Sequence, residues 1–203
     1  QPRSRGLGDV YKRQDIAFLQ YTSGSTSNPK GVMVTNKNLF HNLSLMANDY
    51  NLDQNTITVS WLPIYHDMGL MVGLLESLFV GGKTIFMSPD DFIRAPISWL
   101  KTISKYRGKF SAAPNFAFDL CNMKKIGPET AKILDLSSWK TVINAAEPVK
   151  AEAVKAFTNK FSAYGLPRTA IAPSYGMAET TVYISASKWN QEPIIKKFDN
   201  IFF

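Results

Sequence analysis

The sequence predicts an α/β protein in which layered sheets are flanked by helices. Short apolar runs of strand length alternate along the chain with longer segments that have helical periodicity, and clusters of Gly, Pro, Ser and Asn separate them. This alternation is typical of sheets whose strands are largely buried and whose ligands bind at the strand ends. Because no linker-like stretch interrupts residues 15–203, we expect them to belong to one folded unit.

Strands are predicted where three to seven residues are apolar or β-branched and turn residues bound them. These segments are residues 15–20, 32–34, 56–62, 83–87, 109–113 and 141–144, with a last strand inside residues 169–176.

Helices are predicted where apolar residues recur every three or four positions. Thr35 is a suitable N-cap for a helix over residues 36–49, and Pro96 is well placed to start another. Residues 68–82 are apolar nearly all round, which indicates a buried helix ended by Gly81 and Gly82. Two more helices are expected over residues 115–123 and from about Lys150 onward.

The composition is that of an ordinary globular protein, with 45% hydrophobic and 19% charged residues. The apolar run at residues 68–75 is too short to cross a membrane, so we expect no transmembrane segment and a cytoplasmic location. One cysteine and two histidines show no zinc-type spacing, and Cys121 is interpreted as a buried small hydrophobe.

The formal charge of +7 is partly due to residues 1–14. That segment has no initiator Met and no apolar periodicity, so we interpret it as a cloning or sequence-assembly scar. The other basic residues form no cluster, which favours a small anionic substrate over nucleic acid.

The segment "YTSGSTSNPKG", residues 21–31, lies between two predicted strands and is rich in hydroxyl groups. Its glycines, hydroxyls and Lys30 would suit a polyphosphate, although a solvated turn has the same composition. A P-loop is excluded because Pro29 precedes Lys30 and Gly31 follows it. The SxxK spacing of Ser27 and Lys30 needs a helix, which Pro29 and Gly31 disfavour.

Three later segments, "LPIYHDMGL", "NAAEPV" and "SYGMAETT", follow that loop in order. Together the four segments resemble the adenylate-forming (AMP-binding) enzyme superfamily, and the surrounding sequence is most similar to the fatty acyl-AMP ligases. The resemblance implies that residues 15–203 are part of the large N-terminal domain, truncated at both ends. It places a ribose-binding aspartate and a catalytic lysine beyond Phe203, so we expect this chain alone to be inactive.

The resemblance also implies roles for individual residues. Lys30, Glu179 and His66 correspond to catalytic positions, with Glu179 holding Mg²⁺ and His66 orienting or gating the reacting carboxylate. Many relatives have Thr where this chain has Ala178, so the contact to the α-phosphate is assigned to Thr180. The implied ATP-binding residues are Thr22, Ser23, Gly24, Ser25, Thr26, Lys30, Ala146, Glu147, Pro148, Tyr175, Gly176 and Thr180.

The expected reaction is ATP-dependent activation of a fatty acid to an acyl-adenylate, with Mg²⁺ and release of pyrophosphate. An acyl carrier protein is the expected acceptor, and the acyl pocket is expected around Met68, Met71 and residues 112–121. Two alternatives remain open: an acyl-CoA synthetase, which passes the acyl group to coenzyme A, and a nucleotide-binding module without catalysis.

Overall fold

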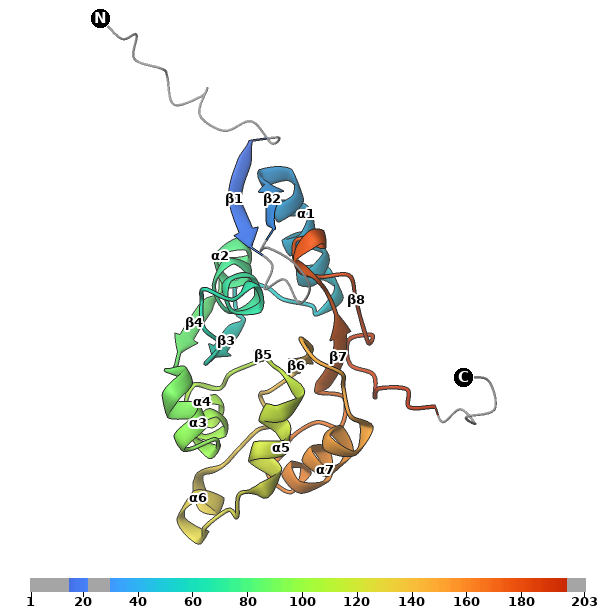
Figure 1. The fold of residues 1–203 in the computed structure, drawn as a ribbon. Coiled ribbons are helices and arrows are strands. Elements are labelled where there is room, and N and C mark those ends of the chain that lie inside the picture. The colour runs from blue at the N-terminus through green and yellow to red at the C-terminus, as the bar shows by residue number, and fades with distance from the viewer. Residues whose placement is uncertain (1–14, 22–29, 197–203) are drawn as a thin grey trace, which may run out of the picture.

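The computed structural model describes residues 15–21 and 30–196 (Figure 1). A six-stranded sheet has the order β4-β3-β5-β6-β7-β8, and β1 pairs with β2 in a separate antiparallel sheet. The strands are β1 Ile16–Tyr21, β2 Gly31–Thr35, β3 Ile57–Ser60, β4 Lys83–Phe86, β5 Phe110–Ala113, β6 Thr141–Asn144, β7 Ile171–Tyr175 and β8 Ser185–Ala186.

The six-stranded sheet is parallel except at one edge. Strands β4, β3, β5, β6 and β7 run in the same direction, whereas β8 pairs antiparallel to β7. The carboxyl ends of the parallel strands therefore lie along one border, where ligands bind in sheets of this kind. The predicted α/β class is confirmed.

Helices cover both faces of this sheet, with α1 and α2 on one side and α3 to α7 on the other (Figure 1). None of the helices within residues 15–21 and 30–196 has the length and apolar character needed to cross a membrane. The helices are α1 Asn36–Asp49, α2 Glu76–Val80, α3 Pro89–Arg94, α4 Ile97–Tyr106, α5 Asn115–Met123, α6 Pro128–Ile133 and α7 Ala151–Ser162, with a π-helix (η2) at Gly69–Leu75 and a 3₁₀-helix (η3) at Ala178–Thr180.

The helix predicted after Thr35 has the predicted bounds and cap. The Thr35 hydroxyl accepts the Asn38 N–H at 3.1 Å, and the Asn38 side chain accepts the Thr35 N–H at 3.2 Å. This reciprocal capping satisfies two backbone donors at the start of α1.

The helix predicted over residues 68–82 consists of two parts. Its first part is the π-helix, and its second part, α2, ends at Gly81 with a φ of 71°. Gly69 lies so close to the preceding turn that a Cβ there would approach the Pro63 carbonyl oxygen to 2.0 Å. The expectation of burial on all sides is wrong for α2, because Leu78 is 68% exposed.

Two short helices, α3 and α6, were not predicted, although both carry a local signal. Pro89 with Asp90, and Pro128 with Glu129, put proline and an acidic residue in the first turn. Proline fits this position because its missing N–H has no helical partner there, and a carboxylate interacts favourably with the helix dipole.

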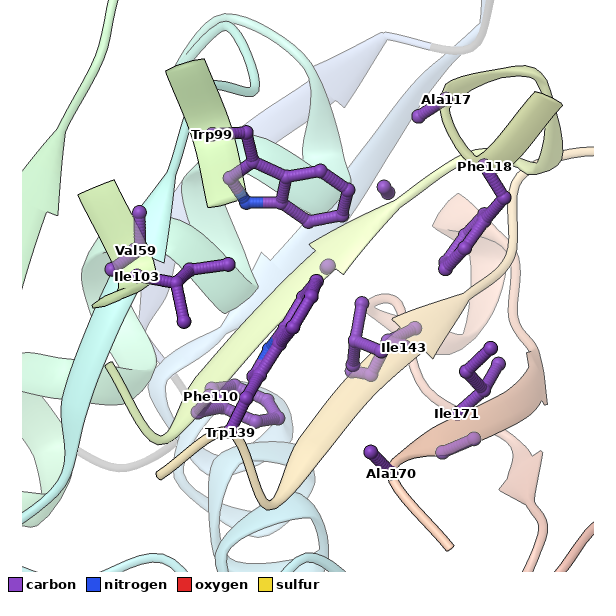
Figure 2. Packing of buried hydrophobic residues seen from close by; sticks show 14 of the residues in the cluster. Val59, Trp99, Ile103, Phe110, Ala117, Phe118, Trp139, Ile143, Ala170 and Ile171 are labelled. Atoms are coloured by element: carbon purple, nitrogen blue, oxygen red, sulfur yellow. The ribbon is translucent and has the colours of Figure 1, made fainter. Parts of the chain in front are cut away.

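The hydrophobic core includes side chains of the sheet that pack against α4, α5 and α7, some of which Figure 2 shows. The same cluster extends to Leu43 and Met46 of α1 and to Met71 and Val72 of η2. The Trp99 and Trp139 rings meet edge to face with centroids 4.9 Å apart, and the Trp139 indole N–H donates to Ser111 Oγ at 2.8 Å. Aromatic pairs in this geometry add to the stabilisation from burial.

Candidate functional site

A cavity of about 200 Å³ lies where β3, β6 and β7 end. It brings together three of the segments that the sequence singled out. The lining residues are Met46, Tyr50, His66, Asp67, Met68, Val72, Ile143, Ala145, Ala146, Ser174, Tyr175, Gly176, Val182 and Tyr183.

The cavity has an exposed rim and a buried floor. His66, Ala146 and Tyr175 are exposed at the rim, and the Tyr175 side chain is 61% accessible. Met68 and Tyr183, by contrast, are buried. A ligand with a polar head and an apolar tail would therefore place its head at the rim and its tail inward.

At the rim, His66 and Asp67 form a close pair with Nδ1 and Oδ1 2.7 Å apart. The hydrogen bond to Asp67 raises the pKa of His66 above its ordinary value, and partial burial opposes this effect. Burial would by itself raise the pKa of Asp67, but hydrogen bonds from His66 and the Met68 N–H hold it below its usual value. The two shifts therefore favour an ion pair, in which the His66 imidazolium is the more exposed partner, with 54% of its side chain accessible against 24% for Asp67.

The loop after β6 supplies a second part of the rim. Ala146 has a φ of 70°, a left-handed conformation that is costly for a residue with a Cβ and that occurs often at functional sites. Glu147 and Pro148 are exposed and do not line the cavity. The Glu147 carboxylate instead accepts the Phe116 N–H at 2.7 Å, so it holds the start of α5.

The third part of the rim is the turn that joins β7 to β8. A Cβ at Gly176 would lie 1.6 Å from the Val182 carbonyl oxygen, so only glycine permits this close approach. Glu179 and Thr180 lie in the 3₁₀-helix of this turn, exposed and outside the cavity lining. The Thr180 hydroxyl donates to the Met177 carbonyl oxygen at 2.9 Å, so the hydroxyl proton already has an acceptor within the turn.

Lys30 is exposed and immediately precedes β2. The strand predicted after Gly31 is confirmed, because β2 covers Gly31–Thr35. The hydroxyl- and glycine-rich residues predicted to bind phosphate, Thr22 to Thr26, lie outside the described residues.

Several lining residues were not identified from the sequence. Met46 was assigned only to the helix over residues 36–49, and Ser174 belongs to a segment noted for other residues. Tyr50 and Tyr183 lie just beyond these two segments and were not singled out. Of the expected acyl pocket, Met68 lines the cavity, whereas Met71 and residues 112–121 do not. Ala112, Phe118 and Cys121 pack instead in the core, and burial raises the pKa of the Cys121 thiol to about 12.

Glu179 lies in an exposed turn. It therefore suits a magnesium ion held jointly by the protein and the substrate phosphates better than one enclosed by protein ligands. Among residues 15–21 and 30–196, no three His, Cys, Asp or Glu side chains are grouped to hold a metal ion. Mg²⁺ is commonly held by one or two carboxylates together with substrate phosphates, so a single carboxylate is sufficient on the protein side. The exposed Tyr175 ring beside Ala146 and Gly176 offers a flat face for a nucleobase.

Comparison with known proteins identifies similar sequences over most of the chain. The AMP-binding enzyme family matches residues 7–198. The medium-chain-fatty-acid–[acyl-carrier-protein] ligase JamA of Moorena producens is 45% identical over 191 residues, covering 92% of this chain and 32% of that protein. The putative fatty-acid–CoA ligase fadD25 of Mycobacterium tuberculosis is 40% identical, covering 98% of this chain and 35% of that protein. The chain thus spans about a third of the length of these relatives.

A solved structure has the same fold over nearly the whole chain. The fatty acyl-adenylate ligase from L. pneumophila, in complex with acyl adenylate and pyrophosphate, superposes with a TM-score of 0.84 at 45% identity. The match covers 90% of this chain and 32% of that one.

Proposed function

Because the chain belongs to the AMP-binding enzyme family, we propose that the protein carrying it activates a fatty acid with ATP. The observation that carries this proposal is the cavity at the strand ends. Its exposed rim has His66, Ala146 and Tyr175, and its floor consists mainly of apolar and aromatic side chains. That arrangement fits a carboxylate and a nucleotide at the rim with an alkyl chain below them.

In the proposed reaction, a carboxylate oxygen of the fatty acid attacks the α-phosphorus of ATP. The bond from that phosphorus to the bridging oxygen breaks, and pyrophosphate leaves with the electron pair, so the products are acyl-adenylate and pyrophosphate. The main task of the protein is to position the two substrates and to balance the charge that builds on the leaving phosphates. No side-chain nucleophile is needed.

Lys30 and Glu179 are assigned to the phosphate end of the site. Both are exposed, one before β2 and the other in the β7–β8 turn. The Lys30 ammonium would contribute a positive charge to the phosphates, and the Glu179 carboxylate would hold Mg²⁺. When bound, Mg²⁺ would neutralise charge on the phosphate oxygens.

His66 is assigned to the fatty acid carboxylate. It lies at the rim above Met68, and the neighbouring Asp67 favours its protonated form. A cationic imidazole would attract the substrate carboxylate to the rim, and loss of the charge would weaken that attraction. We therefore propose an orienting role for His66 rather than proton transfer.

The acceptor of the acyl group is proposed to be an acyl carrier protein. JamA, named as an acyl-carrier-protein ligase, is one of the relatives that support this choice. Coenzyme A is the second candidate, because fadD25 is named as a putative fatty-acid–CoA ligase. Incubating the full-length protein with ATP, a radiolabelled fatty acid and each acceptor in turn would separate the two through the thioester formed.

The adenylation step itself is tested by fatty acid-dependent exchange of pyrophosphate into ATP. We expect exchange with medium or long fatty acids, and less with acetate or amino acids. Selective exchange with an amino acid would contradict the proposed substrate. ATP binding with no exchange for any acid would favour a nucleotide-binding module without catalysis.

A further inference from the structure

We propose that Tyr50, held in place by Ser174, forms the inner wall of the cavity and limits the length of the acyl chain that fits. This inference rests on the proposed function, because it takes the floor of the cavity as the acyl site. It assigns a specificity-determining role to the residue that follows α1, in a part of the chain that carries none of the sequence motifs.

Tyr50 lines the cavity and is almost completely buried, with 1% of its surface exposed. It directly follows the last residue of α1, and Met46, one turn earlier on that helix, also lines the cavity. The rim residues His66 and Tyr175 are exposed. A tail that enters from the rim would therefore meet the Tyr50 side chain at the closed end.

The Tyr50 ring is fixed from several directions. Its hydroxyl lies 2.8 Å from Ser174 Oγ, and Ser174 in turn donates to the Ala172 carbonyl oxygen at 2.9 Å. Tyr50 is therefore the donor in its contact with Ser174. Burial raises the pKa of Tyr50, so the hydroxyl keeps its proton and this bond persists.

Aromatic contacts hold the same ring from its sides. The Tyr50 centroid is 5.7 Å from that of Tyr183, which also lines the cavity, and 5.6 Å from that of Phe110 in β5. A ring packed in this way has no room to turn aside for a longer substrate, because side chains in a close-packed interior move only when their neighbours also move.

Removing the ring should therefore lengthen the cavity. In Tyr50→Ala the space left by the ring would admit further methylenes, each of which gains free energy from burial. In Tyr50→Phe the ring remains and only the bond to Ser174 is lost. Met46→Phe should have the opposite effect, because it adds volume to the floor.

The test compares hexanoate, decanoate and palmitate in the full-length protein. The kcat/KM for acid-dependent pyrophosphate exchange gives the preference for palmitate over hexanoate. We expect Tyr50→Ala to raise this ratio about ten-fold or more, since one or two methylenes in an apolar pocket account for that much discrimination. Tyr50→Phe should leave the ratio nearly unchanged, and Met46→Phe should lower it.

Phe157→Ala is a matched control. Phe157 is fully buried beside Phe118 and outside the cavity lining, so its truncation should destabilise the protein without changing the ratio. If Tyr50→Ala does not fold, Met46→Phe still tests the inference, because it shortens the cavity instead of lengthening it.

Displacement of a fluorescent fatty acid by the same three acids gives the chain-length preference without catalysis. A ratio that is unchanged by Tyr50→Ala and Met46→Phe in both assays would overturn the inference. If the variants shift the binding preference but the wild-type protein catalyses no pyrophosphate exchange, the proposed function is overturned. The role of Tyr50 as the inner wall is then still supported.

Discussion

The side-chain amide of Asn42 pairs with both backbone groups of Tyr183, 141 positions further along the chain. Its Nδ2 donates to the Tyr183 carbonyl oxygen at 2.9 Å, and its Oδ1 accepts the Tyr183 N–H at 3.1 Å. The same Nδ2 lies 3.2 Å from the Thr180 carbonyl oxygen. One buried side chain on α1 thus fixes the turn that carries Glu179.

Replacing Asn42 with Ala should loosen this turn. The substitution leaves the Tyr183 backbone groups without partners, and an unpaired buried polar group costs about 1–3 kcal/mol. Hydrogen exchange of the peptide covering residues 178–185, followed by mass spectrometry of the full-length protein, should become faster. Asn48→Ala, an exposed change on the same helix, is the control. Equal exchange rates in both variants would show that Asn42 does not hold the turn.

Glu76 should make the protein less stable as the pH rises. Glu76 is 1% exposed, and neither of its carboxyl oxygens has a hydrogen-bond partner among the described residues. Burial raises its pKa from 4.5 to about 8. Between these two values the folded state holds a proton that the unfolded state releases. The contribution of Glu76 to the free energy of unfolding therefore falls by up to about 1.4 kcal/mol per pH unit as the pH rises through that window.

Glu76→Gln removes this titration while keeping the size of the side chain. Urea unfolding of the wild type and the variant at pH 5, 6, 7 and 8 gives the difference in their free energies of unfolding. We expect the variant to gain stability relative to the wild type as the pH rises. A constant difference across this range would argue that Glu76 is not held protonated.

Replacing Asp67 with Asn should lower the pKa of His66. The hydrogen bond to Asp67 is the largest cause of the raised pKa, and an uncharged amide would stabilise the imidazolium less. The measurement is an NMR titration of ¹³C-labelled histidine, with His41 as the internal reference because the described chain holds only these two histidines. An unchanged midpoint for His66 in Asp67→Asn would refute the assigned interaction.

Lys30→Ala and Glu179→Gln should each reduce fatty acid-dependent pyrophosphate exchange by about ten-fold or more. This corresponds to a loss of about 1.4 kcal/mol in stabilisation of the transition state. Both side chains are exposed, so the stability of the fold should change little. Lys37→Ala and Glu152→Gln remove the same charges at exposed positions on α1 and α7 and should retain full exchange. Normal exchange in both site variants would contradict their assignment.

Local patterns in the sequence were sufficient for most of the fold. The helix after Thr35 and the parallel strands were predictable because capping and hydrophobic periodicity involve residues close together in the chain. The short helices α3 and α6 carried a proline signal that a fuller reading of the sequence would have used. The π-helix could not be predicted, because its fit against the turn at Pro63 depends on tertiary contact.

The sequence by itself determined the family and three parts of the cavity rim, because His66, Ala146 and Tyr175 lie in short motifs. The tertiary structure alone decided which other residues join them. Tyr50 and Ser174 are 124 positions apart in the sequence and meet only because the end of α1 lies beside β7. Equally, the burial of Glu76 cannot be deduced from its apolar neighbours, since Leu78, two residues later, is exposed. Burial and contact over such distances depend on how whole elements pack, which local periodicity does not encode.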